Sequence, residues 1–253
     1  MVNTLNPNNV LSEFLQRHDD SVQRYNDLYS TVGGNGRLDL RRGLTTDLSF
    51  RLGTEWELFQ HRWHIAAISK RPKKFIAATQ LEMNDALKKA SVKQLLEAIR
   101  PGSTTMPSQL TAERIEAILD PTGFNVTFST QESWAKAASD QLDPLFADRV
   151  RAIVGSPEDS CVLDLLRSLR NVIAHASTSS MNVLNDTVRE RGTSDTIGLA
   201  GETNTSLVRT GSKRIADAAS YLHTWNDVTG MRRIGFLAYR VRAIAERLRV
   251  TAV

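Results

Sequence analysis

Apolar residues return every three or four positions through nearly the whole chain, and this spacing limits the possible folds more than any other feature. Residues at such intervals lie along one face of a helix and can pack into a core. A capping-box pattern at Ser129-Thr130-Gln131-Glu132 predicts the start of a further helix. No segment carries a strand signal strong enough to place a sheet, so we predict a single all-α domain over 1–253. The helical segments are expected at about 10–29, 46–69, 80–99, 111–119, 142–154, 157–175, 213–224 and 231–249.

The clearest helix start lies at Ser156, a good capping residue that is followed by Pro157 and two acids. Proline suits the first helical turn, and Glu158 and Asp159 interact favourably with the positive end of the helix dipole. The helix that begins here is expected to reach His175 and to bury one apolar stripe.

The composition changes after His175, where Ser, Thr, Asn and Gly become frequent. We predict that 177–212 is a long, mobile connection inserted after the helix, with one helical turn at about Val183 to Glu190. Connections of this length are uncommon in compact domains and are often functional.

The bulk composition is that of an ordinary globular domain. Hydrophobic residues make up 41% of the chain and charged residues 24%, so a sizeable core can form. Cys161 is the single cysteine, which excludes an internal disulfide. The N-terminus lacks the basic and apolar regions of a signal peptide, and no stretch approaches the ~18 apolar residues of a membrane span. We therefore expect a cytoplasmic protein without a membrane partner.

Positive charge is concentrated at the C-terminal end. The net charge is +4, and 231–253 alone carries six arginines and one acid. A basic end on a near-neutral body favours an anionic partner, with a solvated helix face as the alternative. Arg233, Arg240 and Arg247 recur every seven residues in the predicted basic helix 231–249, and we predict that they contact RNA. The apolar seam beside them can pack within the monomer or against a second copy.

Arg170 and His175 form the constellation that best suits catalysis. They lie on the helix that begins after Ser156, about 140° apart around its axis and ~7.5 Å apart along it. Asn171 lies on the same side as His175. Histidine moves protons near neutral pH, and arginine holds phosphate through parallel hydrogen bonds. The pair suits metal-free RNA cleavage, in which the ribose 2′-hydroxyl attacks the adjacent phosphate. By itself, the spacing also fits a histidine that only packs or forms hydrogen bonds.

Two runs of sequence resemble the HEPN superfamily. Leu169-Arg170-Asn171-Val172-Ile173-Ala174-His175 resembles its signature, which is an arginine, a polar residue that is often asparagine, three further residues and a histidine. Trp56-Glu57-Leu58-Phe59 is similar to the Trp-Glu-aliphatic-aromatic run in the branch found beside RNA-ligase and phosphatase partners. The likeness covers two helices closely and the remainder only as helical architecture. It implies a HEPN-like helical bundle.

The resemblance implies a metal-independent endoribonuclease. Arg170 and His175 would form the catalytic pair, Asn171 would support them, and Glu57 would polarise or position them. HEPN proteins generally dimerise with two motifs facing one cleft, so a homodimer through the motif-bearing face is expected. Such enzymes resemble toxins of toxin–antitoxin or phage-defence systems, which implies RNA as substrate and an antitoxin or regulatory partner. The family also contains RNA-binding and scaffolding modules that do not cleave, and these are the alternative.

A metal site is a weaker alternative near the upstream acid. Glu57, His61 and His64 are spaced to share one helix face and could begin such a site. No cysteine or second acidic cluster completes the set in the sequence, and aromatic residues interleave with it. We therefore predict no metal and no other cofactor, and interpret both histidines as part of a polar helix face.

Overall fold

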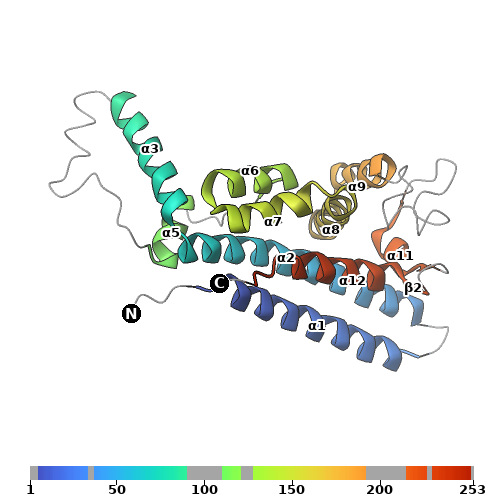
Figure 1. The fold of residues 1–253 in the computed structure, drawn as a ribbon. Coiled ribbons are helices and arrows are strands. Elements are labelled where there is room, and N and C mark those ends of the chain that lie inside the picture. The colour runs from blue at the N-terminus through green and yellow to red at the C-terminus, as the bar shows by residue number, and fades with distance from the viewer. Residues whose placement is uncertain are drawn as a thin grey trace.

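Helix α2 (Leu38–Lys70) runs through the centre of the molecule, and the other elements pack around it (Figure 1). The computed structural model describes residues 5–33, 37–89, 110–120, 128–191, 215–226 and 230–251. These residues are predominantly helical, which confirms the all-α prediction. The other helices are α1 (Pro7–Thr31), α3 (Lys73–Lys89), α5 (Ala112–Leu119), α6 (Gln131–Gln141), α7 (Pro144–Val154), α8 (Pro157–His175), α9 (Thr178–Arg191), α11 (Ala218–His223) and α12 (Arg233–Glu246).

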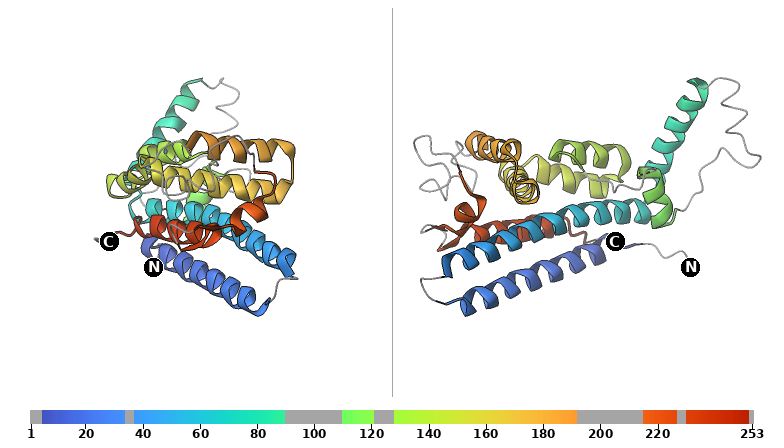
Figure 2. Two further views of the ribbon diagram at one scale, coloured as in Figure 1. Left: turned by 90° about the vertical axis from the view of Figure 1, so that its right-hand side faces the viewer. Right: turned by 180° about the vertical axis from the view of Figure 1, so that it is seen from behind.

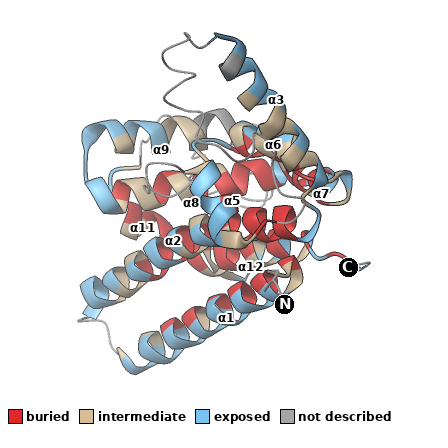
Figure 3. Cartoon of the chain, turned by 90° about the vertical axis from the view of Figure 1, so that its left-hand side faces the viewer, coloured by how far each residue is buried: buried red, intermediate tan, exposed pale blue. Residues whose placement is uncertain are grey.

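The second half of α2 lies at the centre of the core. Every residue from Trp63 to Ser69 is buried, so no face of this stretch meets solvent. A helix that is buried on all sides needs neighbours on all sides. Helix α1 lies along one side of α2, α6 to α9 lie on the opposite side, and α12 runs beside α2 between α1 and α8 (Figures 1 and 2). Figure 3 shows that buried residues concentrate where these helices face one another, while the far end of α3 and the outer face of α1 are exposed.

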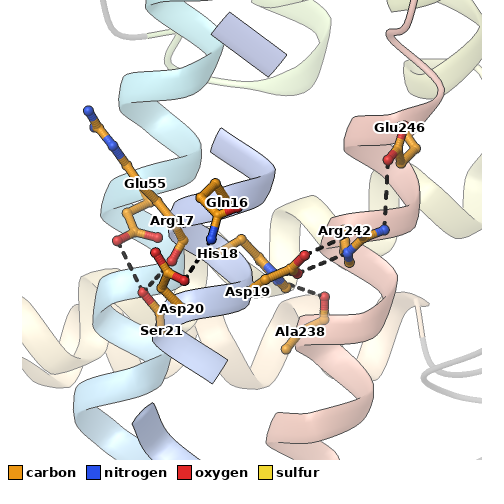
Figure 4. Close-up of polar contacts among 10 residues, drawn as sticks. All are labelled: Gln16, Arg17, His18, Asp19, Asp20, Ser21, Glu55, Ala238, Arg242 and Glu246. Atoms are coloured by element: carbon orange, nitrogen blue, oxygen red, sulfur yellow. Dashed lines mark hydrogen bonds and ion pairs between the residues drawn. The ribbon is translucent and has the colours of Figure 1, made fainter. Parts of the chain in front are cut away.

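Polar contacts fix α1 against α12 (Figure 4). The ring Nε2 of the buried His18 lies 3.0 Å from the carbonyl oxygen of Ala238. Asp19 accepts two hydrogen bonds from Arg242, at 2.9 and 3.2 Å. Where α1 begins, the Asn8 side chain both donates to and accepts from the backbone of Val250. These contacts join segments more than 200 positions apart, so the two ends of the chain belong to one body.

Helix starts follow the capping chemistry of the sequence. Ser156 caps α8 by accepting a hydrogen bond from the backbone N–H of Asp159, as predicted. The capping box of α6 lies one residue later than predicted, because Thr130 and Ser133 cap each other's backbone N–H groups.

Helix α9 is the main departure from the predicted elements, since residues 178–191 are helical throughout, where a mobile connection with one helical turn at about Val183 to Glu190 was expected. The Ser177 hydroxyl accepts from the backbone N–H of Ser180, which starts the helix. Leu184 is fully buried, and Met181 and Val188 pack beside it at helical spacing. The apolar spacing therefore outweighs the low helix propensity of the polar residues. The remainder of the predicted connection, 192–212, lies outside the described residues, as does 90–99 of the third predicted helix.

A short hairpin follows α11. Strands β1 (Trp225–Asn226) and β2 (Met231–Arg232) pair in antiparallel fashion, with Trp225 opposite Arg232. Within the described ranges, no helix is both long and apolar enough to cross a membrane.

Candidate functional site

Helices α2 and α8 approach each other closely at Gly53. A Cβ placed on Gly53 would lie 2.7 Å from the Cβ of Arg170 and 3.0 Å from its Cγ. Real Cβ atoms do not pack that closely, so only glycine permits this approach. Glycine in a helix interior costs about 1 kcal/mol relative to alanine. The close contact explains why glycine occupies this position, because the base of the Arg170 side chain packs directly against the backbone of α2.

Glu57 lies one turn after Gly53 and contacts the other end of the same side chain. The Oε2 of Glu57 is 3.2 Å from Nη2 of Arg170. The Nη1 of Arg170 donates to Oδ1 of Asn171 at 2.9 Å. Both members of the ion pair are partly buried, with 29% of the Arg170 side chain and 27% of the Glu57 side chain exposed. The structure thus brings together three of the four predicted catalytic residues, from two helices.

The guanidinium of Arg170 is fixed in position but keeps N–H donors that can bind a ligand. An arginine carries five N–H groups. The contacts with Asn171 and Glu57 engage one hydrogen on Nη1 and one on Nη2. Each of these nitrogens keeps a second N–H, and the side chain remains partly open to solvent. A phosphate can therefore still bind the fork while Glu57 and Asn171 hold its orientation.

His175 is the last residue of α8, and its side chain is exposed. The chain leaves the helix through Ala176, whose φ of 45° lies in the left-handed region and whose N–H bonds to the carbonyl of Val172. The His175 imidazole forms no hydrogen bond or ion pair in the part of the chain that the structure describes. It is about 7.5 Å along the helix axis from Arg170. The imidazole is thus free to meet a ligand, although it does not contact the other three residues.

The three arginines predicted to contact RNA have partners inside the protein. Arg233 is 4% exposed and donates to the carbonyl of Tyr221 at 2.9 Å, so its side chain does not reach a phosphate in solvent. Arg240 lies 3.6 Å from Glu158 and 3.5 Å from Asp159, at the start of α8. Arg247 pairs with Asp159 as well.

This arrangement gives the arginines a structural role. They join α12 to the two acids that begin α8 and to α11. The expectation of phosphate contacts requires these three arginine side chains to be accessible to a ligand. It does not fit Arg233, because burial removes that side chain from the surface. Arg240 and Arg247 would have to exchange a carboxylate for a phosphate.

The two histidines upstream on α2 point to different neighbours. The Nε2 of His61 is 3.2 Å from Oε1 of Glu116 on α5. The Nε2 of His64 is 2.8 Å from Oε1 of Gln141, and burial lowers the pKa of His64 to about 4. Among the described residues, no group of three His, Cys, Asp or Glu side chains is arranged to hold a metal ion.

Gly53 is the site residue that the sequence interpretation missed. An isolated glycine inside a helical pattern is a signal, because it sacrifices stability unless a neighbour approaches closely. That signal gives the position of a close contact but not its partner, which lies more than 100 residues away on α8.

The sequence matches no protein-family model, and no curated protein or solved structure matches it.

Proposed function

We propose that this protein is a metal-independent endoribonuclease in which Arg170 and His175 carry the reaction and Asn171 and Glu57 support them. The observation that carries the proposal is the contact across α2 and α8, where Glu57 and Asn171 hold the Arg170 guanidinium. His175 lies free on the same helix. A fixed phosphate-binding group and an unengaged proton-transfer group are the two groups that 2′-hydroxyl attack requires, and here one helix carries both.

In the proposed reaction, His175 accepts the proton of the ribose 2′-hydroxyl. The 2′-oxygen then forms a bond to phosphorus, and the bond from phosphorus to the 5′-oxygen breaks. The leaving 5′-oxygen takes up a proton, so the products are a 2′,3′-cyclic phosphate and a 5′-hydroxyl. Arg170 stabilises the charge on the phosphate oxygens as the 2′-oxygen adds. Glu57 and Asn171 are positioning residues, because they contact Arg170.

A non-catalytic RNA-binding or scaffolding subunit of a defence complex is the second candidate. The separation of His175 from the Glu57–Arg170–Asn171 contacts favours it, because one chain does not present the full catalytic pair in mutual contact. A homodimer through the motif-bearing face, as the HEPN resemblance implies, would supply a second motif and remove this difficulty. The two candidates therefore differ in whether the RNA is cut.

An RNA-cleavage assay in EDTA tests the proposal. The wild type should cut RNA, and Arg170→Ala and His175→Ala should each lower the rate at least a hundredfold, as expected for loss of a general base or a charge-stabilising group. Arg62→Ala is the matched control: Arg62 also makes a partly buried interhelical ion pair, 3.0 Å from Glu13, but away from α8. It should cleave like the wild type. Cleavage that persists in both site variants, or that EDTA abolishes, contradicts the proposal, and RNA binding without cleavage favours the second candidate.

The proposed biological role is that of a toxin or phage-defence effector restrained by a protein partner. This role rests on the HEPN resemblance, since fold and site do not specify it. Expression of the wild type should then slow cell growth, while His175→Ala should be tolerated at the same protein level. Equal tolerance of the two chains in cells without a partner would contradict the toxin role.

A further inference from the structure

Arginines and aromatic rings gather where α1 ends, α2 begins and α11 leads into the hairpin. These segments lie together at one end of the molecule (Figures 1 and 2). The aromatic members come from α1, α11 and β1, and the cationic members come from α2 and β2. We call this set the hairpin-end cluster, and it comprises Tyr29, Arg41, His223, Trp225 and Arg232.

The Tyr29 ring is the centre of the cluster. Its hydroxyl is 2.8 Å from Nε2 of His223. The guanidinium carbons of Arg41 and Arg232 lie 4.9 and 5.1 Å from the centre of the ring, so both cations stack on its π-system. Arg232 also lies 5.9 Å from the ring of Trp225. The two guanidinium groups are thus held at fixed places beside aromatic surface.

No carboxylate of the described residues neutralises either of these guanidinium groups. Arg41 donates to the carbonyl of Val32 at 2.8 Å, and Arg232 donates to the carbonyl of His223 at 2.6 Å. Neither contacts a carboxylate in the described segments. Arg240 and Arg247 on α12 differ, because acids of α8 accept both of them.

The positive charge also affects the pKa of His223. Burial lowers the pKa of its imidazole, and the neighbouring Arg232, Arg42 and Arg41 lower it further. Arg42 has Asp39 at 3.8 Å and also interacts with Asp217, so the uncompensated positive charge rests on Arg41 and Arg232. Such charge attracts a negatively charged ligand.

Trp225 adds a flat apolar surface to this charge. Its side chain is 51% exposed, beside the cationic Arg232. An exposed aromatic ring next to arginines is the combination by which proteins hold single-stranded nucleic acid, because bases stack on the ring and phosphates pair with the cations. We propose that Trp225, Arg41 and Arg232 form a binding subsite for single-stranded RNA, with an unpaired base on the indole and adjacent phosphates on the two guanidinium groups.

The choice of RNA over DNA rests on the proposed function, whereas the preference for a single strand follows from the geometry. A base that stacks on Trp225 must expose its face, and bases within a duplex are stacked on each other. The subsite would therefore hold substrate away from Arg170 and His175 and contribute to affinity.

Binding can be measured without cleavage in a His175→Ala background. The probe is a short, fluorescently labelled single-stranded oligoribonucleotide, followed by anisotropy with the full chain. Trp225→Ala should raise Kd by about fivefold to a hundredfold, which is the range for loss of one stacked base. Tyr239→Ala is the matched control, since Tyr239 is also an exposed aromatic, at 61%, and lies outside the cluster. It should leave Kd within about twofold.

The charges are tested by the dependence of affinity on salt. Each phosphate contact that is lost should lower the slope of log K against log salt by about 0.7 for a single strand, so Arg41→Gln should flatten it by about that amount. Arg71→Gln is the control. Arg71 lies just beyond the other end of α2 and pairs with Asp143. It is about 45 Å from Arg41 along the helix, at a rise of about 1.5 Å per residue.

The outcomes separate this inference from the proposed function. Binding that Trp225→Ala leaves unchanged, an unlabelled duplex that competes as well as a single strand, or no binding at low salt would each overturn the subsite. If the single strand binds through Trp225 but the wild type never cuts it, the subsite stands and the ribonuclease proposal fails. If the wild type cuts RNA and Trp225→Ala binds and cuts equally well, the ribonuclease proposal stands and the subsite fails.

Discussion

A methyl group on Gly53 would lie 2.7 Å from the Cβ of Arg170, so a helix–helix contact and the candidate site depend on the same residue. We predict that Gly53→Ala separates α2 from α8, lowers the free energy of unfolding by about 1–3 kcal/mol and reduces RNA cleavage. Gly43→Ala is the control on the same helix, since a Cβ there meets nothing within 4 Å. It should raise stability by up to about 1 kcal/mol, because alanine favours helix. Urea denaturation measures both, and equal effects would contradict the contact.

Glu57 is predicted to act through the orientation of Arg170. In Glu57→Gln the 3.2 Å ion pair is lost, the guanidinium gains freedom, and kcat should fall roughly ten- to a hundredfold. The free energy of unfolding should change by less than about 1 kcal/mol, because the pair is partly exposed. Glu13→Gln breaks the comparable pair with Arg62 and should leave kcat unchanged. A loss of kcat that is the same in both variants would point to a general effect on the fold.

Ala176 adopts a left-handed conformation that suits glycine, directly after His175. Ala176→Gly should therefore raise the free energy of unfolding by about 1 kcal/mol. Ala174→Gly, two residues earlier and inside α8, should lower it by about 0.5–1 kcal/mol. Thermal denaturation of the two variants tests the helix end, and a destabilised Ala176→Gly would show that α8 ends elsewhere.

The buried His64 predicts a loss of stability in mild acid. Its pKa in the folded protein is about 4, below the ordinary value of 6.5, because burial disfavours the charged form. The unfolded chain therefore binds a proton first as the pH falls. The free energy of unfolding is therefore unaffected by the titration of His64 above pH 6.5. Between pH 6.5 and 4 it should fall by about 1.4 kcal/mol per pH unit, which amounts to about 3 kcal/mol in total.

His64→Gln provides the comparison, since glutamine keeps an N–H donor for Gln141 and does not titrate. Urea denaturation from pH 7.5 to 4.5 should show a shallower decline in this variant than in the wild type. Parallel curves would assign the acid sensitivity to other groups.

Local chemistry made most of the helices predictable. The cap at Ser156 and the turn proline after it placed the start of α8 correctly, and helical spacing located most of the other helices. Only one turn of helix α9 was predicted, because its polar residues obscure one buried leucine, Leu184, whose partners come from other helices.

In the candidate site, too, the residues could be predicted from the sequence, but the contacts between helices could not. Arg170, Asn171 and His175 follow from one helix and Glu57 from a resemblance, so all could be named from sequence. The contact between Glu57 and Arg170 could not, because it depends on how two helices cross at Gly53. The basic C-terminal helix shows the same limit: its charge was visible in sequence, but its acidic partners on α1 and α8 were not.

We propose that the protein cuts RNA by attack of the RNA's own 2′-hydroxyl group on the adjacent phosphate, with His175 as the group that moves the proton. The most direct measurement is the cleavage of one RNA and of its 2′-O-methyl counterpart in EDTA, by the wild type and by His175→Ala. The wild type should cut only the unmodified RNA and leave a 2′,3′-cyclic phosphate and a 5′-hydroxyl, and His175→Ala should cut neither RNA. Cleavage of the methylated strand, or equal cleavage by His175→Ala, would contradict it.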